Sequence, residues 1–173
     1  MQTVQQLEEF MTKPSAALVE DIKKIDGDIL ILGIAGKMGP TLAKMAKRAA
    51  EEAGIEKRII GVARFSNKEM KEELESAGIE TITCDLMDEE QLAQLPEIPN
   101  IIFMAGNKFG TVNNEHFTWA MNTYVPGRVA DKFKNSNIVV FSSGNIYPFT
   151  PVTAGNCGED VTPVPVGEYA MST

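Results

Sequence analysis

The chain has 173 residues, of which 43% are hydrophobic and 23% are charged, and its formal net charge at pH 7 is −8. This acidic balance argues against nucleic-acid binding, because contacts with phosphates need a positive surface. The length is enough for one buried core, and the longest apolar run, ILILGIA, is far too short to span a bilayer.

Two cysteines, Cys84 and Cys157, lie far apart in the sequence without the spacing of a metal site. The first residues have neither a basic start nor an apolar signal core, so we expect free thiols in a cytoplasmic protein. The one histidine, His116, lies in the polar run NNEHFTW, where we expect a surface or helix-start residue. No metal site is therefore expected.

Residues 1–26 are predicted to form a helical extension of two short amphipathic helices. Apolar residues recur at helical spacing at positions 4, 7 and 11, and again at 18, 22 and 25. Pro14 begins a new turn between the two segments, and Gly27 ends the second. The remaining residues, 27–173, are predicted to be one domain.

Apolar strands alternate with amphipathic helices through most of that domain. Strands are expected at residues 28–33, 57–63, 79–84, 100–106 and 136–143, and helices at 40–54, 66–78, 87–95 and 114–134. This α/β pattern predicts a doubly wound parallel sheet, a Rossmann fold with strand order 3-2-1-4-5. After Tyr147 the alternation stops and a loop rich in proline and glycine begins. Loops of this kind often carry a functional site.

Three glycines at equal spacing lie between the first strand and the first helix of the domain: Gly33, Gly36 and Gly39. In a dinucleotide-binding turn, one glycine makes the tight turn, one lets the backbone approach the pyrophosphate, and one lets the helix pack on the strand. The helix N-terminus offers its free N–H groups to the phosphates, and Lys37 and Met38 belong to the same turn. A chance triplet in a loop is the alternative. A Walker-type phosphate loop is excluded because Lys37 comes too early and no Ser or Thr follows it.

Arg64 follows the second strand, where an acidic residue commonly holds the adenosine ribose. A guanidinium at this place suits a ribose 2′-phosphate, because its planar fork matches phosphate oxygens. Arg64 therefore favours NADP over NAD, although a solvent-facing charge at a strand end is nearly as well supported.

The sequence from about Asp28 to Thr173 resembles the extended short-chain dehydrogenase/reductases, the NAD-dependent epimerase/dehydratase group. GIAGKMG is similar to their GxxGxxG, CDLMD to the adenine-contacting segment, and MAG to the end of the fourth strand. MNTYVPGRVADKF resembles the helix with a structural asparagine, VVFSSGNIYP the fifth-strand motif, and GEYAMS the approach to YxxxK. The resemblance implies that the cofactor, NAD or NADP, contacts these further residues: Asp85, Leu86, Ala105, Gly106 and Asn122. It also implies that Ser143 and Tyr169 are the catalytic residues facing the substrate.

The chain departs from this family in three respects. Leu32 stands where a threonine often precedes the first glycine, and Thr173 stands where YxxxK has lysine. The C-terminal substrate-binding part of the family is absent from the sequence. We therefore expect a truncated portion of a longer enzyme.

The missing lysine bears on the chemistry of Tyr169. A free tyrosine has a pKa of about 10, so only ~0.1% is phenolate at pH 7, and a nearby ammonium favours the charged form. Threonine can donate a hydrogen bond but supplies no charge. A lysine from elsewhere, such as Lys108, could take that position in space. Tyr169 could also simply pack its ring, and Ser142 and Ser143 could be turn residues.

The function predicted from the sequence is the NAD(P)-binding portion of an epimerase- or dehydratase-type oxidoreductase acting on a hydroxyl or carbonyl carbon. Its substrate would be a small molecule, and by the habit of the family a nucleotide sugar. The alternative is a non-catalytic NAD(P)-binding sensor or scaffold, which Thr173 favours. We also expect self-association into a homo-oligomer, through the long helix with Trp119 or through the N-terminal pair.

Overall fold

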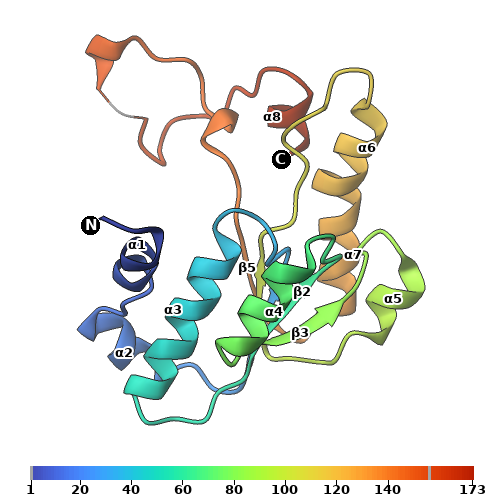
Figure 1. The fold of residues 1–173 in the computed structure, drawn as a ribbon. Coiled ribbons are helices and arrows are strands. Elements are labelled where there is room, and N and C mark those ends of the chain that lie inside the picture. Colours follow the sequence, from blue (N-terminus) through green and yellow to red (C-terminus); the bar gives the residue numbers. More distant parts are fainter. Residues whose placement is uncertain (1, 156) are drawn as a thin grey trace.

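One parallel sheet of five strands forms the centre of the molecule. The computed structural model describes residues 2–155 and 157–173. The strands are β1 (Ile29–Leu32), β2 (Ile59–Ala63), β3 (Glu80–Thr83), β4 (Asn100–Phe103) and β5 (Asn137–Val140), and they lie in the order β3-β2-β1-β4-β5 (Figure 1). The predicted doubly wound sheet and its strand order are confirmed.

Helices cover both faces of this sheet. Side chains of alternate residues along each strand point to opposite faces, so an apolar strand makes both faces apolar and both must be buried. Ile29 and Ile31 pack against one face with α3 (Gly39–Glu52) and α4 (Lys68–Ser76). Leu30 and Leu32 pack against the other, with α5 (Glu89–Gln94) and α7 (Val125–Lys132). All four residues of β1 are buried, as expected for the central strand.

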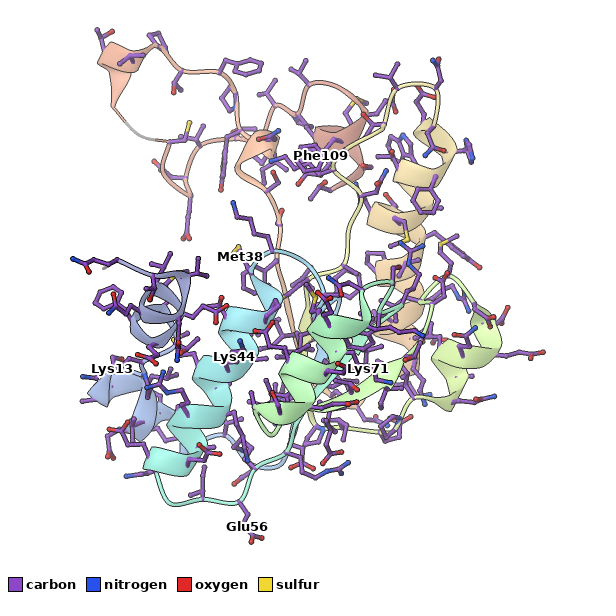
Figure 2. All side chains as sticks on the ribbon, in the orientation of Figure 1. Lys13, Met38, Lys44, Glu56, Lys71 and Phe109 are labelled. Carbon is purple, nitrogen blue, oxygen red and sulfur yellow. The ribbon has the colours of Figure 1, made fainter. Side chains whose placement is uncertain are left out.

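The N-terminal extension is a pair of helices on the outer side of α3. They are α1 (Val4–Met11) and α2 (Ala16–Ile22), capped by Thr3 and Ser15, and residue 1 of the predicted range lies outside the described residues. Ile22 packs on Ala49 and Ala50 of α3. Polar contacts hold α1 against α3. Arg48 of α3 donates to the hydroxyl of Thr12, the C-cap of α1, at 2.6 Å, and Lys44 forms an ion pair with Glu8. Figure 2 labels Lys44 on α3.

The long helix expected over residues 114–134 consists of three segments. α6 (Glu115–Trp119) is followed by a π-helical turn, η1 (Ala120–Tyr124), and then by α7. Pro126 lies at the start of α7 and has no N–H to donate to the preceding turn. The N–H of Val125 bonds five residues back to the carbonyl of Ala120, so the widened turn absorbs the proline.

The C-terminal segment runs over the carboxyl ends of the strands. It contains two short 3₁₀ turns, η2 (Gly144–Ile146) and η3 (Val152–Ala154), and ends in α8 (Glu168–Ser172). Figure 1 shows α8 near the top of α6, and Trp119 Nε1 donates to the Glu168 carboxylate at 2.5 Å. In the part of the chain that the structure describes, no helix is long and apolar enough to cross a membrane.

Candidate functional site

Two adjoining hollows lie where the loops after the strands meet, at the carboxyl edge of the sheet. Their volumes are about 360 Å³ and 390 Å³, and they share the residues Gly33, Gly36, Met104, Ala105 and Gly106. This edge is where ligands bind in open α/β sheets. The shared residues come from the loops after β1 and β4, which are neighbours at the point where the strand order reverses.

Each of the three glycines has a separate structural reason. Gly33 has φ +89°, and a Cβ on it would lie 2.6 Å from the Ala105 nitrogen. A Cβ on Gly39 would lie 2.6 Å from the carbonyl carbon of Ile34, so only glycine lets α3 pack this close to the turn. Gly36 differs, because the nearest atom to its Cβ would be the Gly33 carbonyl oxygen at 3.4 Å, and it lines both hollows. The turn thus leaves space beside Gly36 for a ligand to approach the backbone.

The start of α3 faces the same space with its N–H groups uncapped. Met38 occupies the N-cap position and makes no side-chain hydrogen bond to the helix, and Pro40 follows in the first turn. Lys37, Met38 and Gly39 line the hollow of about 360 Å³, and Figure 2 labels Met38 at this end of α3. An uncapped helix N-terminus beside a glycine turn and a lysine is suited to binding phosphate groups. The residues present therefore fit a dinucleotide.

Arg64, Asp85 and Leu86 line the hollow of about 390 Å³, together with the ends of β2 and β3. Arg64 is exposed, and no carboxylate within the described residues forms an ion pair with it. The Asp85 carboxylate accepts the Met87 N–H at 3.0 Å, and Leu86 is 6% exposed. Burial, with the charges of Asp85 and Asp88, raises the pKa of the Cys84 thiol to about 11, so this lining residue is uncharged at neutral pH.

Tyr169 and Thr173 line the other hollow from α8 and its end, opposite the glycine turn. The Lys108 ammonium lies over the Tyr169 ring, 5.6 Å from its centroid. The Thr173 hydroxyl donates to the Tyr169 carbonyl at 2.7 Å. Figure 2 shows Phe109, the neighbour of Lys108, at the same end of the molecule as α8.

Asn122, in the π-helical turn, connects the loop after β4 to α8. Its side chain accepts the Asn107 N–H at 2.7 Å and donates to the Asn107 carbonyl and the Ser172 hydroxyl, both at 3.0 Å. Thr123 adds a hydrogen bond to the Ser172 carbonyl at 2.9 Å. Asn122 lines the hollow as well, so it positions the walls of the site from within.

The structure thus brings together all the residues predicted to contact the cofactor, whereas Ser143 lies apart from them. Ser142, not Ser143, lines the hollow, and the Ser143 hydroxyl accepts the Asn145 N–H at 3.2 Å as the cap of η2. Met104, the first residue of the MAG segment, lines both hollows from the end of β4, whereas Asn107 was not predicted. Strand-end position was a signal for Met104, but nothing local in the sequence marked Asn107. Among residues 2–155 and 157–173, no group of three or more His, Cys, Asp or Glu could hold a metal ion.

Comparison with known families identifies the family to which the sequence is similar. Residues 29–172 match the model of the NAD dependent epimerase/dehydratase family, which is the resemblance expected from the sequence motifs. A search among curated protein sequences found no significant match.

Solved structures share the fold at low sequence identity. UDP-glucuronic acid 4-epimerase from Bacillus cereus, in complex with NAD, has a TM-score of 0.65 and 18% identity, covering 84% of this chain and 48% of that one. ADP-L-glycero-D-manno-heptose-6-epimerase from Helicobacter pylori has a TM-score of 0.66 and 19% identity, covering 86% and 50%. A putative epimerase from Burkholderia cenocepacia J2315 has a TM-score of 0.63 and 19% identity, covering 85% and 46%. The chain spans about half the length of these structures.

Proposed function

The chain belongs to the NAD dependent epimerase/dehydratase family, and from this membership we propose that it binds a nicotinamide adenine dinucleotide at the carboxyl edge of its sheet. The open space beside Gly36, next to the uncapped start of α3, is the observation that carries the proposal. The pyrophosphate would bind at this turn, the adenosine toward Arg64, Asp85 and Leu86, and the nicotinamide toward Tyr169. Ala105, Gly106 and Asn122 would line the wall between the two ends.

The reaction proposed is oxidoreduction at a hydroxyl- or carbonyl-bearing carbon of a small molecule. When bound, the dinucleotide would be the donor or acceptor of the hydride. Tyr169 exchanges a proton with the substrate oxygen, and a serine hydroxyl after β5 orients that oxygen. Ser142 lines the hollow as it stands, and Ser143 would have to leave its cap on η2 to do so.

A nucleotide sugar is the substrate class that we propose, as part of a protein that extends beyond this chain. Structures of the same fold include epimerases of UDP-glucuronic acid and of an ADP-heptose. Half of each of those chains has no counterpart here, so the residues that would select the sugar are not among those described.

Free thiols at Cys84 and Cys157 suit a reducing compartment, and we propose a cytoplasmic location.

The cofactor proposal is tested by titrating the purified chain with NAD and NADH in a calorimeter. In Gly36→Asp, a carboxylate would occupy the space left beside the turn and repel the pyrophosphate, so we expect binding to fall by at least about 100-fold, the scale of losing a desolvated charge contact. The matched control is Gly144→Asp in η2, an exposed position outside both hollows where no atom beyond the neighbouring residues lies within 4 Å of the new Cβ. Equal binding by both variants, or none by the unaltered chain, would refute the proposed site.

A non-catalytic NAD(P) sensor is the second candidate, and one observation favours it. Thr173 carries no charge and uses its hydroxyl on the Tyr169 backbone, so the usual cation beside the tyrosine is missing at that position. The two functions differ in one readout. In the longer protein proposed above, an enzyme would reduce bound NAD on addition of UDP-glucuronic acid or UDP-glucose, seen as nicotinamide absorbance, whereas a sensor would leave it oxidised.

We also propose that the chain forms homodimers. A groove of about 940 Å³ between α5, α6 and α7 is lined by Trp119 and Tyr124, which are 37% and 58% exposed. The groove carries acidic groups, such as Asp131, and basic groups, such as Arg128. A surface with both signs of charge can complement itself across a two-fold axis, which favours a second copy as its occupant.

A further inference from the structure

Lys108 is the feature that neither the family motifs nor the cofactor proposal uses. It lies in the loop between β4 and α6, two residues beyond Gly106. Its ammonium is 5.6 Å from the centroid of the Tyr169 ring, and both side chains line the hollow that contains the glycine turn. Residues 61 positions apart in the chain thus face each other in the hollow where the nicotinamide would lie.

The other charged groups around Tyr169 do not take this place. Lys37 lines the same hollow but belongs to the glycine turn, where the phosphates would bind. The Glu168 carboxylate, next to Tyr169 in the chain, accepts the Trp119 N–H. The Thr173 side chain has no charge, and its hydroxyl donates to the Tyr169 carbonyl. Among the described residues, Lys108 is the one cation stacked on this ring.

The placement of Lys108 does not depend on the lysine side chain alone. Its neighbour Asn107 has both its N–H and its carbonyl bonded by Asn122, and the same asparagine donates to Ser172 of α8. Asn107 also donates to Thr118, which is fully buried. One network therefore sets the loop that carries Lys108 and the helix that carries Tyr169 relative to each other.

We propose that Lys108 is the electrostatic partner of Tyr169, supplying from the β4–α6 loop the positive charge that Thr173 does not supply. The inference rests on the proposed oxidoreduction. In the reducing direction, Tyr169 would give its hydroxyl proton to the carbonyl oxygen of the substrate as hydride reaches the carbonyl carbon, and a phenolate would remain. The phenolate charge is delocalised over the ring, so an ammonium above the ring stabilises it. Lys108 acts through Tyr169, and is a positioning residue for the reaction.

The test measures phenolate formation and needs neither substrate nor dinucleotide. The chain has three tyrosines, and in a Tyr124→Phe/Tyr147→Phe background Tyr169 is the only one left. Phenolate absorbance is then followed between about pH 9 and pH 10, where lysines remain mostly protonated. In Lys108→Gln we expect the ratio of phenolate to phenol at a given pH to fall roughly two- to fivefold, the range for charge pairs in contact with solvent.

Two further variants make the result decisive. Lys108→Arg keeps the charge and should restore the ratio, and Lys134→Gln removes an exposed lysine distant from the hollow and should leave it unchanged. Far-ultraviolet circular dichroism checks that each variant is folded. An unchanged ratio in Lys108→Gln, or an equal fall in Lys108→Arg, would overturn the proposal. Because the dinucleotide titration is independent, failure of one proposal is distinguishable from failure of the other.

Discussion

At the scale of single residues, the site is defined by which side chains are absent as much as by those present. Gly33 and Gly39 are required by close packing, since a Cβ on either would clash with the backbone of Ala105 or Ile34. Gly36 has no such neighbour. Its lack of a side chain therefore serves the space in the hollow and not the fold, and this separates the residue that we propose to bind the pyrophosphate from two structural ones.

The sequence predicts that Arg64 favours NADP over NAD. It is exposed at the rim of the adenosine end of the site, and no carboxylate of the described residues competes for it. In Arg64→Gln we expect affinity for NADP to fall about tenfold, the value of one charge-assisted contact, with affinity for NAD unchanged. Calorimetric titration with both dinucleotides checks this.

The matched control for Arg64 is Lys68→Gln. Lys68 is the first residue of α4, is exposed, and does not line the hollow. If the Lys68 variant lost as much NADP affinity as the Arg64 variant, the effect would come from overall charge. If Arg64→Gln left NADP binding intact, the preference for NADP would be wrong.

Local sequence was sufficient to predict the residues that line the two hollows, and insufficient to predict how the candidate catalytic residues are placed. Gly33, Gly36 and Gly39 were predictable because they lie within one turn whose chemistry is local. The sequence named Lys108 as a candidate for the missing charge, but Lys108 lies in a loop and Tyr169 in a helix far apart in the chain, so only the folded structure brings the two together. Ser142 and Ser143 are adjacent in the sequence, and the choice between them depends on a turn in which Ser143 caps η2.

At the scale of elements, α8 depends on its neighbours for its position. It has five residues, fewer than an isolated helix needs to be stable in water. Trp119 bonds Glu168 near its start, and Asn122 and Thr123 bond Ser172 near its end. The π-helical turn that carries Asn122 was not predicted, since the sequence showed a helical period but not how Pro126 would be accommodated.

We expect Asn122→Ala to loosen α8 and the loop after β4 together. It leaves the Asn107 N–H and carbonyl without their partner, which costs about 1–3 kcal/mol of unfolding free energy. Chemical denaturation measures this loss. Trp119 is the only tryptophan, so a red shift of its emission in the folded state reports the release of α8. Asn145→Ala, an exposed asparagine in η2, is the control; equal stability and emission in both variants would show that Asn122 does not hold the two segments.

At the scale of the whole molecule, the sheet is covered unevenly. Parallel sheets are normally buried on both faces, yet Val139 and Val140 of the edge strand β5 are 61% and 56% exposed. The chain spans about half the length of the solved structures it resembles. The alternating pattern predicted the sheet and its order, because burial on two faces leaves a continuous apolar run in each inner strand. The pattern could not predict what lies against β5, because the alternation of strands and helices does not say which segment covers an edge strand.

The groove between α5, α6 and α7 is where we expect two copies to meet. In Tyr124→Glu a carboxylate would be buried against the partner, so sedimentation velocity at micromolar concentration should show the dimer of the unaltered chain converted to monomer. The control is Phe149→Glu, which adds the same charge at a side chain that is 93% exposed and lies outside the groove. An unaltered chain that sediments as a monomer would contradict the homodimer outright. A dimer that survives Tyr124→Glu would move the interface away from the groove. The strand β5, with Val139 and Val140 61% and 56% exposed, would then be the surface to alter next.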